Sequence, residues 1–254
     1  MTNSENWQGS FAIGPGWAVF VGMPGENTEH AHHAIQICLA GEVPIELRVD
    51  EEVHRITDVA VIPSGRRHSV RWCGGPGALV YLEPDGAPGR QVVLASGREG
   101  ARLESVDRIR RVIHELSDAP RKIRGDELLR IRDQALGAWR VPQTNAETSG
   151  DPRIDQICTE VRRRLGDTSI RVGDLAAEVG LSPNRLAELM HEHAGITPRR
   201  FILWTRLEHA VSMAAGGHPL TEVAAKAGFS DSAHLARTFR RMFGTSLSRG
   251  LAPL

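Results

Sequence analysis

The chain has few cysteines and no net charge, and each shortage excludes a class of protein. Cys38, Cys73 and Cys158 are its only cysteines, and they are widely spaced. This spacing argues against a disulfide framework and against a four-cysteine zinc site, and it favours a reducing compartment. Lysine plus arginine and aspartate plus glutamate both number 31, so the formal net charge is +0. No bulk electrostatic attraction to a polyanion is therefore expected.

Long hydrophobic runs and aromatic residues are also scarce. No apolar run approaches the roughly 20 residues of a transmembrane helix. Residues 1–6 lack the basic and apolar regions of a secretory signal. We therefore expect a cytoplasmic protein with no membrane partner. The chain has 254 residues, of which 41% are hydrophobic and 24% charged, which is typical of a globular protein with two domains.

The C-terminal third contains an internal repeat. Residues 175–182, Leu-Ala-Ala-Glu-Val-Gly-Leu-Ser, return as residues 223–230, Val-Ala-Ala-Lys-Ala-Gly-Phe-Ser. Each copy predicts a helix, a glycine turn and the capped start of a second helix, because Gly180 and Gly228 can adopt the left-handed conformation that ends a helix. This is the pattern of a helix-turn-helix. Two copies in tandem indicate double-stranded DNA as a partner.

The segments that follow each turn are amphipathic. In the first copy we expect Ser182 to cap a helix over residues 183–194, and in the second we expect Ser230 to cap the helix that follows. The residues expected to face inward are Leu186, Leu189, Met190, Leu235, Phe239 and either Met242 or Phe243. Between the copies, Thr197-Pro198 predicts the start of a third helix, from 199 to about 215, that acts as a rigid spacer.

Residues 151–251 resemble the DNA-binding domain of the AraC/XylS transcription regulators. The motifs that carry the resemblance are Asp174-Leu175-Ala176, Gly180-Leu181-Ser182, Arg206-Leu207-Glu208-His209-Ala210, Val223-Ala224, Gly228-Phe229-Ser230-Asp231-Ser232 and Phe239-Arg240-Arg241-Met242-Phe243-Gly244-Thr245-Ser246. The closing stretch departs from the family, which usually has Ser-Pro and then Tyr-Arg near its end. Here Ser246-Leu247 and Gly250-Leu251 stand instead.

DNA contacts are predicted on the outer faces of the two reading helices, at Asn184, Arg185, Glu188 and His191 in the first, and at Ser232, Ala233, His234, Arg237 and Arg241 in the second. Of these, the resemblance implies base contacts at Asn184, Glu188, Ser232, Ala233 and Arg237, and it adds Ala187 and Ala236. Because a carboxylate accepts from cytosine N4 but repels phosphate, Glu188 predicts that the second helix contributes more of the affinity. The alternative is a helical interaction domain without nucleic acid. Residues 151–254 hold 14 basic and 11 acidic residues, a balance of only +3.

The N-terminal half reads as a series of short strands. Glycine- and proline-rich turns separate them, which is typical of a β-barrel or sandwich. The strands are expected at 35–39, 43–49, 59–62, 69–72, 78–82 and 91–94. The predicted fold class is α+β, with a cupin-like β-barrel, a helical pair and an all-α tandem helix-turn-helix domain. The expected boundaries are 1–100, 101–141 and 151–254.

Two motifs resemble those of cupin barrels. His30-Ala31-His32 precedes a strand, and Pro63-Ser64-Gly65-Arg66-Arg67-His68 fits Pro-x-Gly-x-x-His. The resemblance implies an effector pocket that His30, His32, Gln36, His68 and Trp72 line. The three histidines could also ligate a metal. Gln36 stands where metal-binding cupins have a glutamate, so we expect no cofactor and no tightly bound metal. We expect Cys38 to share a face with Gln36 as a small buried residue.

Residues 103–140 change to helical spacing, which predicts an antiparallel helix pair broken at Asp118-Ala119-Pro120. The pair either mediates a homodimer, as the resemblance implies, or only packs on the barrel. Residues 141–151 read as a linker.

The leading interpretation is a transcriptional regulator that reads DNA and responds to a small-molecule effector in its barrel. One alternative is a cupin-type metal-dependent enzyme, or a metal sensor, fused to a DNA-binding domain. Another is an architectural DNA-binding protein with an inactive barrel. Since spacing alone places no catalytic constellation, we expect no enzyme activity. Effector, operator and the choice between activation and repression are left open.

Overall fold

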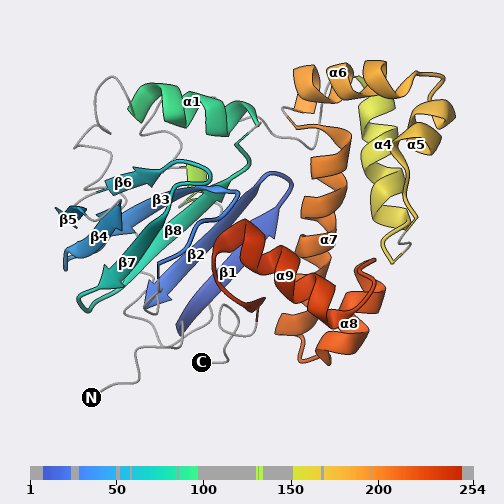
Figure 1. The fold of residues 1–254 in the computed structure, drawn as a ribbon. Helices are drawn as coiled ribbons and strands as arrows, with labels where there is room; N and C mark the ends of the chain where they lie inside the picture. Colours follow the sequence, from blue (N-terminus) through green and yellow to red (C-terminus); the bar gives the residue numbers. More distant parts are fainter. Residues whose placement is uncertain are drawn as a thin grey trace.

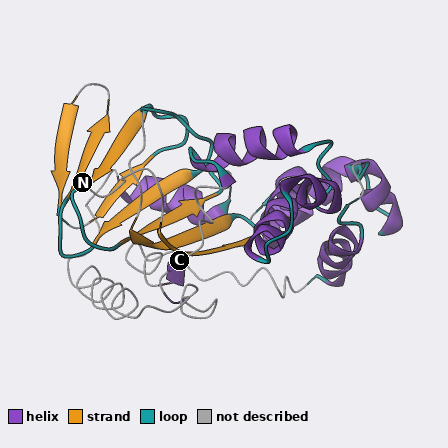
Figure 2. Ribbon diagram, turned by 90° about the horizontal axis from the view of Figure 1, so that it is seen from below, coloured by secondary structure: helices purple, strands orange, loops and turns teal. Residues whose placement is uncertain are grey.

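A part made of strands and a part made of helices lie side by side (Figures 1 and 2). The computed structural model describes residues 8–23, 29–49, 52–57, 59–84, 86–96, 130, 132–133, 151–166, 169–194 and 196–247. The α+β class is confirmed, with the strands in the N-terminal half and a helical C-terminal region.

The strands form two antiparallel sheets. The first has the order β1-β2-β8-β3-β6 and the second the order β5-β4-β7. The bounds are β1 Gln8–Gly14, β2 Trp17–Met23, β3 Ile35–Ala40, β4 Ile45–Val49, β5 Glu52–Ile56, β6 Val59–Ile62, β7 His68–Trp72 and β8 Gly77–Leu82. The expected strands at 35–39, 43–49, 59–62, 69–72 and 78–82 are thus present within one or two residues. Strands β1, β2 and β5 had not been predicted individually.

Both faces of the central strands are buried. Every residue of β3 and every residue of β8 is buried, and Gln36 on β3 pairs with Tyr81 on β8. Gln36 and Cys38 share one face, as expected, and the Gln36 side chain contacts the Cys38 thiol. These strands therefore bring polar side chains into the interior of the part formed by the two sheets, which is called the barrel below.

One predicted strand is wrong. Residues 91–94 lie in helix α1, Ala87–Ser96, which follows the last barrel strand (Figure 1). The segment begins with Ala87-Pro88, and proline is favoured in the first turn of a helix because its missing N–H has no partner there. The short apolar run Val92-Val93-Leu94 fits a helix as well as a strand.

The C-terminal helices follow the expected order. They are α4 Pro152–Arg163, α5 Val172–Glu178, α6 Pro183–Ala194, α7 Pro198–Ala215, α8 Leu220–Lys226 and α9 Ser232–Phe243. The turn glycines Gly180 and Gly228 have φ of 68° and 76°, so both adopt the left-handed conformation that the repeat predicts. The side chains expected to face inward in α6 and α9 are buried, and the alternatives Met242 and Phe243 are both buried.

The structure confirms two of the predicted helix starts, at Ser182 and at Thr197-Pro198, and corrects the third. Ser182 accepts a hydrogen bond from the backbone N–H of Arg185 and begins α6, as expected. Helix α9 is capped by Asp231, which accepts from the backbone N–H of His234 at 2.6 Å, and not by Ser230. A carboxylate also interacts more favourably with the helix dipole than a hydroxyl does. Thr197 holds the N-cap position of α7 but makes no capping hydrogen bond.

The predicted helix pair at 103–140 lies outside the described residues, apart from three of them. Arg130, Arg132 and Asp133 are helical. The Arg132 guanidinium stacks on the Trp17 ring of β2, 4.6 Å from its centroid. This contact shows that part of the segment touches the barrel. Among the residues that the structure describes, no helix combines the length and hydropathy that a bilayer crossing requires.

Candidate nucleic-acid interface and sensor site

The first reading helix, α6, presents a nearly neutral outer face. Asn184, Arg185, Glu188 and His191 are all exposed. Arg185 donates to Glu188 at 3.0 Å, one turn along the helix. An exposed pair of this kind is worth at most about 1 kcal/mol and opens readily when a phosphate competes. Until it opens, the pair cancels the only basic side chain among the four predicted contacts.

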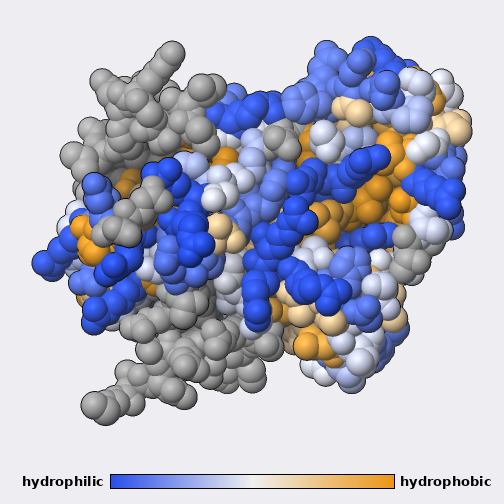
Figure 3. All heavy atoms as spheres, in the orientation of Figure 1, coloured by the Kyte–Doolittle hydropathy of each residue, from blue (hydrophilic) through white to orange (hydrophobic). Residues whose placement is uncertain are grey.

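The second reading helix, α9, is more basic. Arg237, Arg240 and Arg241 are exposed, and hydrophilic side chains gather over this helix on the surface (Figure 3). Ala233 is exposed and Ser232 half-buried. His234 is turned back, because its Nδ1 lies 3.1 Å from Ser230 Oγ and its ring stacks edge-on against Phe229. Arg237 and Arg241 are thus better placed than His234 to reach DNA.

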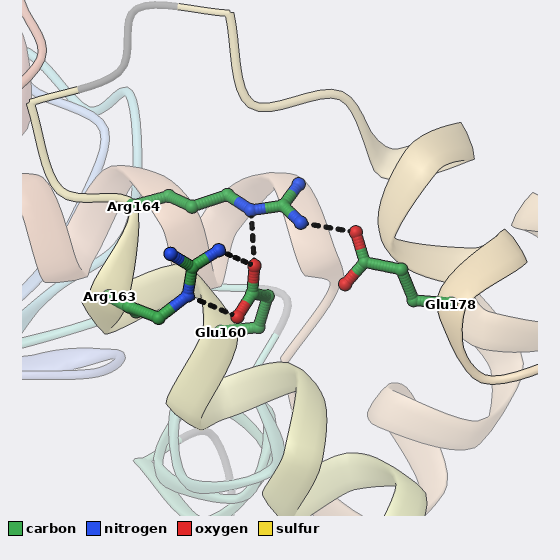
Figure 4. A network of polar contacts seen from close by, with 4 residues as sticks. All are labelled: Glu160, Arg163, Arg164 and Glu178. Atoms are coloured by element: carbon green, nitrogen blue, oxygen red, sulfur yellow. Dashed lines mark hydrogen bonds and ion pairs between the residues drawn. The ribbon is translucent and has the colours of Figure 1, made fainter.

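Two arginines that look available for phosphate already have partners. Arg163 and Arg164 at the end of α4 both donate to Glu160, and Arg164 also donates to Glu178 of α5 (Figure 4). The hydrogen bond from Arg163 is the main reason that the pKa of Glu160 is lowered to about 2. This network connects α4 to the first helix-turn-helix. Its arginines therefore stabilise the packing of these helices and are not free to bind phosphate without breaking these contacts.

The structure brings the three predicted histidines together at the mouth of the barrel. The backbones of His30 and His68 exchange two hydrogen bonds of 2.9 Å, which places the first cupin-like motif beside the second. One ring nitrogen each of His30, His32 and His68 lies within 4.8 Å of the others. Trp72 lies on the same strand as His68, four residues further on, and is half-buried.

The ring nitrogens of two of these histidines are directed by backbone carbonyls. His32 Nδ1 lies 2.9 Å from the carbonyl oxygen of Ala34, and His68 Nδ1 lies 2.8 Å from that of Arg66. Burial lowers the pKa of both rings to about 4, so both are neutral at pH 7. Each Nδ1 then carries the proton, and the lone pair is on Nε2. Among the described residues, His68 Nε2 has no hydrogen-bond partner.

Gln36 engages the remaining nitrogen of His32. Its Oε1 lies 2.8 Å from His32 Nε2, and its Nε2 lies 3.0 Å from Cys38 Sγ. In this orientation His32 faces two acceptors, which only the doubly protonated ring satisfies. The neutral ring requires the amide oxygen and nitrogen to exchange places, so that the NH2 group donates to His32 and the Cys38 thiol donates to the oxygen. Burial raises the pKa of Cys38 to about 12, so the thiol proton is present.

The end of α9 packs against this mouth. We call Phe239, Phe243 and Gly244 the α9 stopper. Phe243 is fully buried, and its ring contacts that of Tyr81 in the barrel at a centroid distance of 5.2 Å and that of Phe11 on β1 at 6.0 Å. The loop that carries the histidines also binds the last turn of α9. The His33 N–H donates to the carbonyl of Arg241 at 2.8 Å, and the Ala34 N–H donates to that of Met242 at 3.3 Å.

A buried carboxylate joins the barrel to the spacer helix α7. Glu83, 1% exposed, accepts from Trp204 Nε1 at 2.9 Å and from His33 Nε2 at 3.0 Å. Arg200 Nε lies 3.5 Å away. Burial alone would raise the pKa of Glu83, but the hydrogen bonds from His33 and Trp204 and the charge of Arg200 outweigh it and lower the pKa below its usual value. The carboxylate is therefore ionised at pH 7.

Sequence reasoning missed this junction between the parts. Glu83 directly follows a buried strand, and Trp204 lies in the middle of the predicted spacer helix. The two large aromatic residues of the spacer helix, Phe201 and Trp204, were a signal that the helix has a buried face. Nothing in the sequence pairs that tryptophan with Glu83, because 121 positions separate them.

Comparison with known proteins assigns the C-terminal region to a domain family. Residues 175–251 match the family described as a helix-turn-helix domain. The C-terminal region contains a helix-turn-helix domain. Its first motif consists of α5 and α6, and its second of α8 and α9, which confirms the tandem arrangement predicted from the repeat. The spacer helix α7 connects the two motifs.

Several proteins are similar to the chain. An uncharacterised HTH-type transcriptional regulator of Staphylococcus aureus strain MSSA476 is 28% identical over 129 residues, which cover 46% of this chain and 17% of the relative. The HTH-type transcriptional regulator YpdC of Escherichia coli K12 is 27% identical over 161 residues, 62% of this chain and 54% of its own. The chain therefore spans only part of the length of these relatives.

Solved structures are similar as well. ToxT of Vibrio cholerae, with an unsaturated fatty acid bound, aligns over 97% of this chain and 96% of its own, with 13% identity and a TM-score of 0.48. A regulator with an AraC-type DNA-binding domain from Chromobacterium violaceum aligns over 41% of this chain and 94% of its own, with 21% identity and a TM-score of 0.38.

Proposed function

We propose that the chain is a sequence-specific DNA-binding transcriptional regulator whose barrel senses a small-molecule effector. The observation that carries the proposal is the pair of exposed reading helices in an AraC-type domain. Helix α7 between them has 18 residues, so it is about 27 Å long at 1.5 Å per residue. With part of the width of each motif added, the reading helices can reach two successive major grooves, about 34 Å apart.

The localisation, the oligomeric state and the domain boundaries follow from the same proposed function. The regulator would work in the cytoplasm, where bacterial DNA is found, and would associate as a homodimer through residues 101–141. The division into 1–100, 101–141 and 151–254 belongs to the proposal too. The relatives named above are regulators, which favours this function over the alternative of a cupin-type enzyme.

The effector is proposed to bind at the histidine cluster, with Gln36 and Trp72 nearby. Because the rings of His32 and His68 are neutral, the site favours an uncharged ligand over a charged one, whose desolvation nothing at the cluster would offset. The lone pair of His68 Nε2 can accept a hydrogen bond, so the ligand should carry a hydroxyl or an N–H group that donates to it. Tyr81, whose hydroxyl also has no partner among the described residues, offers a further polar contact.

A metal ion is the second candidate for the same site. Three imidazole nitrogens within 4.8 Å, two of them on rings held by backbone carbonyls, resemble a ligand set for a borderline ion such as Zn²⁺. Against it, the lone pair of His32 is engaged by Gln36, and among the described residues the cluster includes no carboxylate that would neutralise the charge of the ion. We therefore retain the prediction that no metal is tightly bound. Elemental analysis of protein purified without a histidine tag tests it.

Arg237→Ala is expected to weaken specific DNA binding by about 1–3 kcal/mol and to relax one position of the site, since the exposed Arg237 lies outside the buried face of α9. The measurement is fluorescence anisotropy on the selected site and on its single-base variants. The matched control is Arg163→Ala, which removes an exposed arginine that is paired within α4 and should change affinity little. A uniform loss on every sequence would make Arg237 a phosphate contact instead.

A further inference from the structure

The stopper at the end of α9 lies in direct contact with the histidine cluster, with no room for an additional group between them. A Cβ placed on Gly244 would lie 2.2 Å from His30 Nε2 and 2.9 Å from His32 Cδ2. A Cβ atom essentially never lies this close to a non-bonded heavy atom, so even one added methyl group forces the helix end or the histidines to move. Gly244 is also the C-cap of α9, with a left-handed φ of 73°. The same residue therefore ends the reading helix and closes the barrel mouth.

The stopper is held by both halves of the protein. Phe239 and Phe243 pack on each other at 4.7 Å and on Phe11 of β1, while Phe243 also contacts Trp204 of α7 at 5.6 Å. Two backbone hydrogen bonds from the histidine-bearing loop, donated by His33 and Ala34, then hold the last turn of α9. A displacement at the cluster therefore acts directly on the helix that carries Arg237.

We propose that the end of the second reading helix is the stopper of the barrel, so that any molecule that fills the mouth beside the histidine cluster releases α9. Effector binding and the docking of α9 then exclude each other, and each weakens the other by the same factor. This inference rests on the proposed function, because it describes how the same sensor site would signal to the DNA-reading surface. Helix α9 is the element that moves, and Gly244 is the residue at which effector binding and the docking of α9 compete.

Gly244→Ala in the full chain tests the proposal by filling the mouth with one methyl group. The reporters are the backbone amides of His33 and Ala34, which donate to α9 only while it is docked. Their hydrogen exchange should accelerate about tenfold or more, because forcing an extra methyl group into a filled site shifts an equilibrium by that order. The amides of α6 should stay protected, which separates release from unfolding.

Gly217→Ala is the matched control. Gly217 also has a left-handed φ, 82°, but a Cβ there would meet nothing within 4 Å. It therefore imposes the same backbone strain without filling the mouth, and exchange at His33 and Ala34 should stay at the wild-type rate. Combining His30→Ala with Gly244→Ala removes the atom at 2.2 Å and should restore much of the protection. Unchanged exchange in Gly244→Ala, or equal acceleration in Gly217→Ala, would overturn the proposal.

Phe11→Ala provides a second route if Gly244→Ala does not fold. It removes the aromatic contacts of Phe11 with Phe239 and Phe243, which help to hold the stopper against the barrel. It leaves every residue of the AraC-type domain intact, so the same two amides should again exchange faster. Wild-type rates in this variant would contradict the proposal. DNA binding is measured separately for each variant. If the variants release α9 but the protein does not bind DNA, the proposed function is wrong and the stopper proposal stands. If the protein binds DNA but the variants do not release α9, the stopper proposal is wrong and the proposed function stands.

Discussion

Glu83→Ala is expected to lower the free energy of unfolding by about 3–5 kcal/mol, which is the usual effect of removing one partner from a buried ionic network. The Glu83 side chain is 1% exposed and has three partners. Its loss leaves the indole N–H of Trp204 buried without an acceptor. It also leaves the Arg200 side chain, 28% exposed, without its carboxylate. Denaturant titration followed by circular dichroism measures the loss.

Two milder substitutions separate the contributions. Glu83→Gln keeps an acceptor for the indole N–H and removes the charge, so we expect a loss of about 1–2 kcal/mol. Trp204→Phe removes the donor alone, keeps most of the buried ring and should cost about as much. If Glu83→Ala cost no more than Glu83→Gln, the carboxylate would not anchor α7, and this account of the junction would be wrong.

Acid is expected to destabilise the barrel between about pH 6.5 and pH 4. The pKa values of His32 and His68 fall to about 4 in the folded protein because burial disfavours their charged forms. Below pH 6.5 the unfolded chain therefore binds protons that the folded chain does not, so stability falls as the pH falls. For one such histidine the loss is about 3 kcal/mol when the pH reaches 4. The pKa of Glu83 is lowered instead, so its contribution disappears only at still lower pH.

The measurement is the free energy of unfolding across this pH range in metal-free protein. The double variant His32→Asn, His68→Asn should flatten the profile. An asparagine amide can still donate to the carbonyls of Ala34 and Arg66, but it does not titrate. The control is His54→Asn, because His54 lies on the exposed strand β5 and should leave the profile unchanged. A wild-type profile that is already flat above pH 4.5 would show that the two rings are not buried as neutral groups.

Most of the helical domain could be predicted from the sequence because its signals are local. The repeat, the turn glycines Gly180 and Gly228 and the cap Ser182 each act within one turn of chain, and each of them is found where it was expected. The cap of α9 was predicted at Ser230 and lies at Asp231, because both are good N-cap residues and they are adjacent. Local signals thus fix the helices well and their ends less well.

The barrel and its mouth depend on contacts that are distant in sequence. The two cupin-like motifs predicted that His30, His32 and His68 converge, and they do. The apolar run in α1 was read as a strand because its length suited either element. The contacts of α9 with the barrel and of Glu83 with α7 could not be predicted, because the sequence around Gly244 and around Glu83 does not indicate which residues lie next to them. Gly244 was noted only as part of the motif at 239–246, yet it lies against two histidines.

The central claim is that this chain reads DNA through two helices held by a rigid spacer. Selection of bound duplexes from a random pool by the purified full chain, followed by footprinting on the enriched site, tests it most directly. We expect one enriched sequence with two protected boxes on the same face of the duplex, with centres about ten base pairs apart. The box read by α9 should be the more strongly specified. A pool that shows no enrichment, or a footprint confined to a single groove, would contradict the account.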